Sequence, residues 1–290
     1  MTRIANWRFV RRLRRATLSR LPFATLQSDV RDVVYLTWVV PVASVQALLP
    51  AGVELVQQDG KTLFTALSYR HGHFGPAGAG VLRKLFPSPL QSNWRLYVRR
   101  LPGGVAADRM VLFVRNVFDS VAYAIGSRLA SDALPSHLAA RFEHRRTDSG
   151  YETVIDPGRG SAPALASTTM RTNVRELPGA LAPFFADWPD AVAFLCDQQS
   201  AIVSVDDEAR IAQAGISLPI DLETVEPLIS MSTVGAGFLA SIGATGDPFC
   251  FAVPGVQFKV LWERLLIEAR NRGAHDPALR AIGSDATDGR

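Results

Sequence analysis

Three polar side chains alternate along one short stretch of the chain. Asn93, Arg95 and Tyr97 lie two residues apart, so in a β-strand all three project from the same face. The residues between them are apolar and form the opposite face: Trp94, Leu96 and Val98. An amide, a planar bidentate donor and a phenol in one row can orient a carboxylate or carbonyl inside a pocket. The same spacing also fits a solvated row on an outer sheet face.

The row belongs to a longer pattern over residues 91–129. The pattern predicts a strand, a turn at residues 102–104 (Pro-Gly-Gly), a second apolar strand, and a helix that opens at Asp119 or Ser120. Two candidate site residues follow the row: Arg115 on the second strand and Tyr123 in the helix.

Composition favours a globular protein. The chain has 290 residues, of which 48% are hydrophobic and 20% charged, so it can form one large domain or two modest ones and bury a substantial core. The net charge of +4 is uneven, because seven arginines fall within the first twenty residues. Outside that segment no cluster of basic and aromatic residues indicates nucleic-acid binding. Cys196 and Cys250 stand far apart in apolar surroundings, which predicts buried free thiols and a reducing, cytoplasmic setting.

Sequence motifs give no cofactor or metal. The chain has no dinucleotide fingerprint, no phosphate-binding loop with its lysine, and no nucleophile elbow. His71 and His73 could face one way on a strand, but no third ligand lies nearby, so a metal site is not expected. The glycine-rich and proline-rich stretch at 70–92 is expected to be a loop that could cover a cavity mouth.

The N-terminal residues 1–25 are expected to form a basic amphipathic helix, with the pattern strongest at 3–21. Apolar residues gather on one side of it and arginines on the other, with Arg14 as an exception. Such a helix can lie at the inner, anionic face of a membrane, pack on its own domain, or remain a frayed basic arm. Its apolar runs are too short to span a bilayer.

The rest of the chain divides into strand-like runs joined mostly as hairpins. Asp59-Gly60 separates runs at 53–57 and 62–69, and Asp148-Ser149-Gly150 separates runs at 138–146 and 151–155. A helix is predicted over 181–195, broken near Trp188-Pro189. Further strands are expected at 33–40, 164–174, 201–205, 210–216, 228–234 and 249–260, and a short helix at 42–49. This order favours a β-rich α+β domain over residues 26–265 with a few peripheral helices, followed by a disordered tail over 266–290.

From about residue 30 to residue 262 the chain resembles the YqjF-like family of uncharacterised bacterial proteins, which is similar to acetoacetate decarboxylase. The segments that carry the resemblance are 40–50 with 52–55, 93–98, 114–115 leading to 122–123, 194–195, 216–222 and 254–256. The resemblance implies an antiparallel, cone-shaped barrel whose interior is a ligand pocket.

The chain departs from that resemblance where the chemistry would occur. Acetoacetate decarboxylase forms a Schiff base through a lysine amine with a lowered pKa. The matching region, Val121–Tyr123, contains no lysine, and Gln91 stands where the family favours a glutamate. The chain has only three lysines, and none is expected to be buried: Lys61 follows a turn, Lys84 lies in a loop-like stretch, and Lys259 alternates with apolar neighbours.

Two hypotheses for the function follow. In the first, the pocket binds a small, partly apolar carboxylate or carbonyl compound, with Arg95 or Arg115 as the charged anchor and Asn93, Tyr97 and Tyr123 as orienting groups. In the second, a lysine-independent enzyme acts on a keto acid, the two arginines stabilise an enolate, and Tyr97 or Tyr123 supplies a proton. The absence of a group that titrates near neutral pH favours binding. The oligomeric state does not follow from the sequence.

Overall fold

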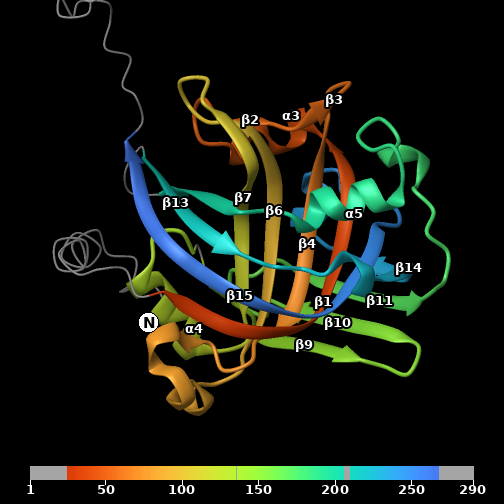
Figure 1. Ribbon diagram of the computed structural model, residues 1–290. Helices are drawn as coiled ribbons and strands as arrows, with labels where there is room; N and C mark the ends of the chain where they lie inside the picture. The colour runs from red at the N-terminus through yellow and green to blue at the C-terminus, as the bar shows by residue number, and fades with distance from the viewer. Residues whose placement is uncertain (1–24, 135, 206–209, 268–290) are drawn as a thin grey trace, which may run out of the picture.

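The protein is seen here in a computed structural model, which describes residues 25–134, 136–205 and 210–267. Residues 1–24 of the predicted N-terminal helix and residues 268–290 of the predicted tail lie outside these ranges, and the first two residues of the predicted tail instead end strand β15 (Phe249–Ile267). The described part is rich in strands, with four short α-helices (Figure 1). The α-helices are α3 (Val42–Val45), α4 (Val121–Ala130), α5 (Trp188–Cys196) and α6 (Phe238–Ser241). The 3₁₀ segments are η1 (Gln46–Leu48), η2 (Ala77–Leu85), η3 (Gly179–Leu181) and η4 (Leu222–Thr224).

The longer strands pair in a closed circuit. In the order of pairing they are β1 (Leu26–Pro41), β4 (Lys61–Arg70), β6 (Leu90–Arg100), β7 (Ala106–Phe118), β12 (Ser200–Val205), β13 (Arg210–Ser217) and β15 (Phe249–Ile267). The circuit closes because β15 also pairs with β1, with Leu26 opposite Val260 and Thr37 opposite Phe249. One face of these strands is therefore turned inward around a shared interior.

The remaining strands extend from this circuit. An arm leaves β15 in the order β14 (Glu226–Val234), β11 (Leu165–Arg171), β10 (Gly150–Asp156) and β9 (Arg141–Arg146). Four short strands add at the edges: β2 (Glu54–Leu55), β3 (Gln57–Gln58), β5 (Gly75–Pro76) and β8 (Ser136–Leu138).

The expectation of a wholly antiparallel sheet is not met. β12 pairs parallel to β7, with Ser200 opposite Met110, and β8 also pairs parallel to β7, with Asn116 opposite Ser136. Parallel neighbours cannot be joined by a tight turn. Between β7 and β12 the chain accordingly runs through α4, β8–β11 and α5 before it returns. The sheet is mixed, and its hairpins account for only part of the pairing.

The two turn signals in the sequence form the hairpins that they predict. Asp59 and Gly60 both have positive φ, of 49° and 72°, as the tight turn between β3 and β4 requires. Gly150 begins β10 just after the turn that joins it to β9, where its NH is bonded to Thr147 Oγ1 at 3.0 Å. A methyl group at Gly150 would lie 1.8 Å from the carbonyl oxygen of Thr169 in β11.

We expect Gly150→Ala to lower the free energy of unfolding by about 1–3 kcal/mol, because the two strands must separate to admit the new methyl group. Gly126→Ala is the control, since nothing lies within 4 Å of that position in α4. There the substitution should raise stability by about 0.4–1 kcal/mol through helix propensity and reduced unfolded-state entropy. Urea unfolding of both variants measures the contrast. Equal effects would contradict it.

Helix α5 starts where the sequence pattern was expected to break. Asp187 is the N-cap, its side chain accepting a hydrogen bond from the NH of Asp190, and Pro189 lies in the first turn. A proline there loses no helical hydrogen bond, because the first NH groups of a helix have no partner within it. The helix predicted over 181–195 is therefore only partly present: residues 182–187 form turns and irregular structure, and the α-helix begins at Trp188, at the predicted break, and ends at Cys196.

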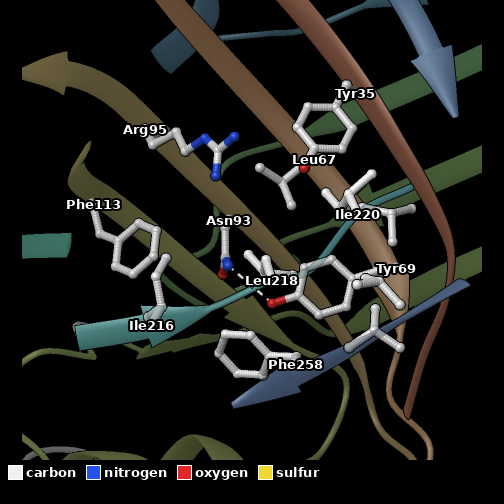
Figure 2. A pocket seen from close by; sticks show the side chains of 13 residues that line it. Tyr35, Leu67, Tyr69, Asn93, Arg95, Phe113, Ile216, Leu218, Ile220 and Phe258 are labelled. Atoms are coloured by element: carbon white, nitrogen blue, oxygen red, sulfur yellow. Dashed lines mark hydrogen bonds between the residues drawn. The ribbon is translucent and has the colours of Figure 1, made fainter. Parts of the chain in front are cut away.

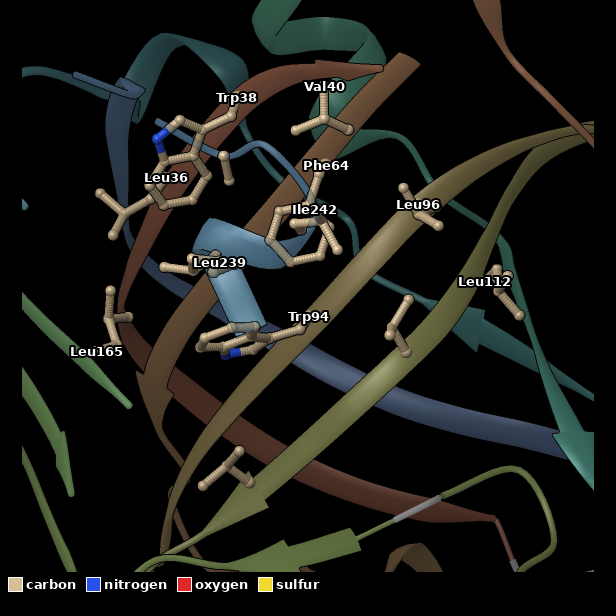
Figure 3. Packing of buried hydrophobic residues seen from close by; sticks show 14 of the residues in the cluster. Leu36, Trp38, Val40, Phe64, Trp94, Leu96, Leu112, Leu165, Leu239 and Ile242 are labelled. Carbon is tan, nitrogen blue, oxygen red and sulfur yellow. The ribbon is translucent and has the colours of Figure 1, made fainter. Parts of the chain in front are cut away.

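Two apolar cores lie on opposite faces of the same strands. The outer core contains Trp38, Phe64, Trp94 and Leu96, covered by Leu239 of α6, by Ile242 just after α6, and by residues of the arm (Figure 3). The inner core contains Tyr35, Leu67, Tyr69 and Tyr97 together with α5 residues such as Trp188 and Leu195. The alternation of β6 therefore separates the row Asn93, Arg95 and Tyr97, which faces inward, from Trp94, Leu96 and Val98, which face the outer core.

Candidate functional site

A cavity of about 30 Å³ lies against the polar row, within the circuit of strands (Figure 2). One water needs about 10–15 Å³ by this measure, so the empty space corresponds to about two or three waters. Most of the wall is apolar. It is formed by Val30, Val33, Tyr35, Leu67, Tyr69, Asn93, Arg95, Phe113, Ile216, Leu218, Ile220, Val256 and Phe258. Every strand of the circuit except β12 contributes to it.

Arg95 supplies the positive charge of the cavity. Its side chain is only 2% exposed, and its Nη2 donates to the carbonyl oxygen of Leu195 at 2.6 Å, near the C-terminal end of α5. The guanidinium also lies 5.4 Å from the ring centres of Tyr35 and Tyr97. The partial negative charge of a helix C-terminus and the faces of two aromatic rings both favour a cation.

The charge of Arg95 is nevertheless incompletely compensated. Within the described residues no carboxylate lies within ion-pair distance of it, and its buried Nε has no hydrogen-bond partner. A buried donor without a partner is costly, and a buried charge without a counter-ion more so. Both deficits would be met by one anion in the adjoining cavity.

A chain of buried hydrogen bonds fixes the polar end of the cavity. Asn93 Nδ2 donates to the hydroxyl of Tyr69 at 2.9 Å (Figure 2). Asn93 Oδ1 accepts from Gln91 Nε2 at 2.6 Å. Gln91 Oε1 lies 2.6 Å from His71 Nε2, and His71 Nδ1 lies 2.8 Å from Ser28 Oγ. The row on β6 is therefore held in place by β1, β4 and the residue that follows β4.

The donors in this chain can be assigned from the amide of Gln91. Because its NH₂ group donates to Asn93, its oxygen must accept from the Nε2–H of a neutral His71, whose Nδ1 then accepts from Ser28. Tyr69 accepts from Asn93, and none of the described residues accepts the hydrogen of its phenol. That O–H can donate into the cavity. A glutamate at position 91 would lack the NH₂ that bonds Asn93, so the glutamine suits this arrangement.

Burial keeps the tyrosines and the histidine around the cavity neutral. Loss of solvation raises the pKa of the phenols of Tyr35, Tyr69 and Tyr97, so they remain protonated donors. Loss of solvation also lowers the pKa of His71 from 6.5 to about 4, partly offset by its hydrogen bond to Gln91. Near neutral pH, the described polar groups of the site are Arg95 in charged form and neutral donors and acceptors.

This arrangement predicts an acid-sensitive fold. Protonating buried His71 costs about 3 kcal/mol, since one pH unit corresponds to about 1.4 kcal/mol. The pKa is lower in the folded state, so this stability is complete above pH 6.5 and is lost as the pH falls towards 4. Between neutral pH and pH 4, the free energy of unfolding measured by urea titration should fall by about 3 kcal/mol more for wild type than for His71→Gln. If the stability of the two proteins depended on pH in the same way, His71 would not be the cause of the acid sensitivity.

The predicted site residues separate into two groups. Asn93 and Arg95 line the cavity, and Tyr97 lies behind Arg95, where its hydroxyl is 2.9 Å from Thr65 Oγ1. Arg115 lies on the opposite face, 5.2 Å from the ring centre of Phe238 in the outer-core region. Tyr123 donates to the carbonyl of Phe74 at 2.7 Å. The geometry brings the row together and leaves Arg115 and Tyr123 away from the cavity.

No lysine lines the cavity. Lys61 and Lys84 are exposed, and Lys259 is half-buried next to Phe258, whose ring forms part of the wall. Neighbouring residues of a strand point to opposite faces, so the amine of Lys259 is directed away. Among the described residues no three His, Cys, Asp or Glu side chains gather as metal ligands. None of the described helices has the length and apolar character needed to cross a bilayer.

The sequence did not identify several residues of the wall. Tyr35 stands between apolar residues on β1, and Tyr69 is the last residue but one of β4, so neither position is marked as part of a site. They face the row because β4 pairs with β6, with Leu67 opposite Asn93 and Thr65 opposite Arg95. The segment with Leu218 and Ile220 follows β13 and closes another side of the cavity. Tyrosines among buried strand residues were the only signal in the sequence that could have indicated these wall residues.

Known structures of similar fold include acetoacetate decarboxylases and an enduracididine biosynthesis enzyme. Acetoacetate decarboxylase from Legionella pneumophila subsp. pneumophila strain Philadelphia 1 has a TM-score of 0.58 at 10% identity, over 85% of this chain and 88% of that one. The enduracididine biosynthesis enzyme MppR complexed with pyruvate has a TM-score of 0.54 at 12% identity, over 86% and 92%. An acetoacetate decarboxylase-like enzyme from Sphingomonas wittichii RW1 has a TM-score of 0.54 at 12% identity, over 85% of this chain and 94% of that one.

At these identities the likeness concerns the fold alone. No curated protein matches the sequence. A family model does: DUF2071, described as "Uncharacterized conserved protein (COG2071)", matches residues 27–187, more than half of the chain. That range contains β1, β4, β6 and β7, and with them the polar row and Arg95. The chain therefore belongs to the DUF2071 family of YqjF-like proteins, which shares the fold of the acetoacetate decarboxylase-like enzymes.

Proposed function

We propose that the protein binds a small, partly apolar carboxylate or carbonyl compound in the cavity beside Arg95. The observation that carries the proposal is the buried guanidinium without a carboxylate partner among the described residues and with an unbonded Nε. A ligand carboxylate would supply both the counter-charge and the acceptor. The apolar wall favours a ligand with a short hydrocarbon part.

The second polar contact of the ligand would be made at the other end of the cavity. The hydroxyl of Tyr69 is positioned by Asn93 and has a hydrogen to donate. A keto or hydroxyl oxygen could accept it while the carboxylate binds Arg95. Among the proteins of similar fold, MppR has been solved with pyruvate, which has both groups. We propose that the circuit of strands acts as the cone-shaped barrel around this ligand, in a reducing cytoplasm suited to the two buried free thiols.

A panel of small acids paired with their neutral amides tests this function. Acetate, pyruvate and acetoacetate should each raise the melting temperature more than the corresponding amide, because only the acid compensates Arg95. At one hundred times its dissociation constant a ligand stabilises the fold by about 2.7 kcal/mol. Equal shifts for acids and amides would show that the cavity does not recognise negative charge.

The alternative function is a lysine-independent enzyme that acts on a keto acid. The observation in its favour is that Arg95 and the Tyr69 hydroxyl both reach the cavity, where they could stabilise negative charge that develops on a carbonyl oxygen. Against it, the buried phenols have raised pKa values and are poor proton donors to a reaction. Turnover of any keto acid in the panel would favour the enzyme, and binding without turnover would favour the binding protein.

Borohydride trapping separates both readings from Schiff-base chemistry. With acetoacetate and borohydride, the intact mass should stay unchanged, since no lysine amine lies at the cavity. A mass increase that corresponds to a reduced adduct would identify a reactive amine and return the protein to covalent catalysis.

A further inference from the structure

Four apolar side chains are exposed together on one short segment. In and just after η2, Val81 is 81% exposed, Leu82 62%, Leu85 82% and Phe86 37%. We call these four residues the η2 patch. Single exposed apolar residues are common on soluble proteins, but a contiguous group indicates an interaction surface.

The segment that carries the η2 patch is held firmly at its base. Arg83 donates to the carbonyl oxygens of Gly72 and His73 at 3.1 and 3.0 Å and pairs with Asp29 at 2.7 Å. The ring of Phe86 covers Gly75, where an added Cβ would lie 2.8 Å from ring atoms. Contacts on the inner side of the segment thus fix it, while the side chains of Val81, Leu82 and Leu85 remain in solvent.

The η2 patch lies where the basic end of the chain enters the fold. The NH of Ala77, the first residue of η2, donates to the carbonyl of Thr25 at 2.8 Å, so the first described residue lies beside this segment. Twenty-four residues precede Thr25 in the sequence. They contain seven arginines and no acidic residue. Lys84, which lies between Leu82 and Leu85 in the sequence, adds an exposed positive charge next to the η2 patch. In Figure 1 the orange coil of this segment projects beyond the start of β1, beside α4.

We propose that the η2 patch docks onto an anionic lipid bilayer. Val81, Leu82 and Leu85 enter the boundary between headgroups and acyl chains, Lys84 contacts lipid phosphates, and the seven arginines that precede Thr25 in the sequence add positive charge. Apolar insertion combined with positive charge is the pattern of proteins that lie on a membrane without crossing it. This positive charge favours an anionic bilayer over a second apolar protein surface as the partner.

Co-sedimentation of the full chain with vesicles tests the proposal. The vesicles contain phosphatidylcholine alone or mixed with phosphatidylglycerol. Wild type should bind the mixed vesicles and lose binding as salt is raised. The variant Val81→Ser/Leu82→Ser/Leu85→Ser should bind them at least about tenfold more weakly, since apolar burial is removed. Arg8→Gln/Arg11→Gln/Arg12→Gln/Arg15→Gln should lose the preference for anionic lipid.

The control variant is Ile229→Ser/Met231→Ser/Val234→Ser, which removes three exposed apolar side chains from β14. It should bind like wild type. Leu85→Asp, a single change at the most exposed position, is the second test variant should the triple serine variant not fold. Wild-type binding by the two η2 variants, absence of vesicle binding by wild type, or equal loss in the β14 control would each overturn the proposal.

Discussion

Arg95→Met should weaken binding of the recognised acid by about 30- to 5,000-fold, which is the 2–5 kcal/mol expected when one partner of a buried charge contact is removed. The loss arises because the ligand carboxylate would enter an apolar cavity without a counter-charge. Binding of the paired neutral amide should change far less. Isothermal titration of acid and amide with both proteins measures the two effects.

The same substitution should leave the empty protein as stable as wild type or make it more stable. Arg95 is buried without a carboxylate among the described residues, and replacing a poorly compensated buried charge by an apolar side chain is often neutral or stabilising. Reduced binding with an unchanged or higher melting temperature is the signature of a residue kept for its ligand. Arg115→Met is the matched control, since Arg115 lies on the other face of the sheet and should not affect affinity.

Trp94→Ala should lower the free energy of unfolding by about 3–5 kcal/mol, as expected for a large aromatic side chain deleted from a core. Trp94 is fully buried, and its Nε1 donates to Ser92 Oγ at 3.0 Å. Its ring packs edge-on against Phe64, with ring centres 5.9 Å apart, and at a tilt against Phe238, with ring centres 5.6 Å apart. Its removal leaves a cavity beneath α6 and an unfilled space in the outer core (Figure 3).

The control for this prediction is Trp262→Ala near the end of β15. Trp262 is partly exposed and lies over Gly215, so its deletion removes contacts on one side only. We expect Trp262→Ala to lower the free energy of unfolding by less than about 1.5 kcal/mol, as for most substitutions outside a core. Urea unfolding compares the two. A loss at Trp94 no larger than at Trp262 would contradict the packing described for the outer core.

Local rules predicted the framework of the site well. The two hairpin turns, the strand–turn–strand–helix order of residues 91–129 and the common face of Asn93, Arg95 and Tyr97 all follow from spacing and turn chemistry, and the structure has them. Alternation alone could not tell whether the row faced solvent. That choice depends on α5 and the segment after β13, which cover the inner face and come from distant parts of the chain.

Arg115 shows how one extra residue defeats a prediction from spacing. The pairing of β6 with β7 shifts between Trp94 and Arg95, so that Trp94 lies opposite Arg115 while Arg95 lies opposite Phe113. This bulge places Phe113 in the cavity wall and directs Arg115 to the outer face. Nothing in the local sequence marks the bulge.

Tyr69 was missed for a different reason. It faces the cavity because β4 lies beside β6, and these strands are joined by the long segment over residues 71–89, not by a tight turn. A hairpin turn fixes the register of its strands, whereas a long connection does not. The hydrogen bond between Asn93 and Tyr69, and with it the second polar contact of the cavity, therefore depends on tertiary structure.

The central claim is that a ligand carboxylate binds the guanidinium of Arg95 inside the circuit of strands. A crystal structure of the full chain with the tightest-binding acid of the panel tests it most directly. The account predicts carboxylate oxygens within hydrogen-bond distance of Arg95 Nε, with the remaining polar group of the ligand at the Tyr69 hydroxyl. A carboxylate bound away from Arg95, or a ligand joined to a lysine amine, would contradict it.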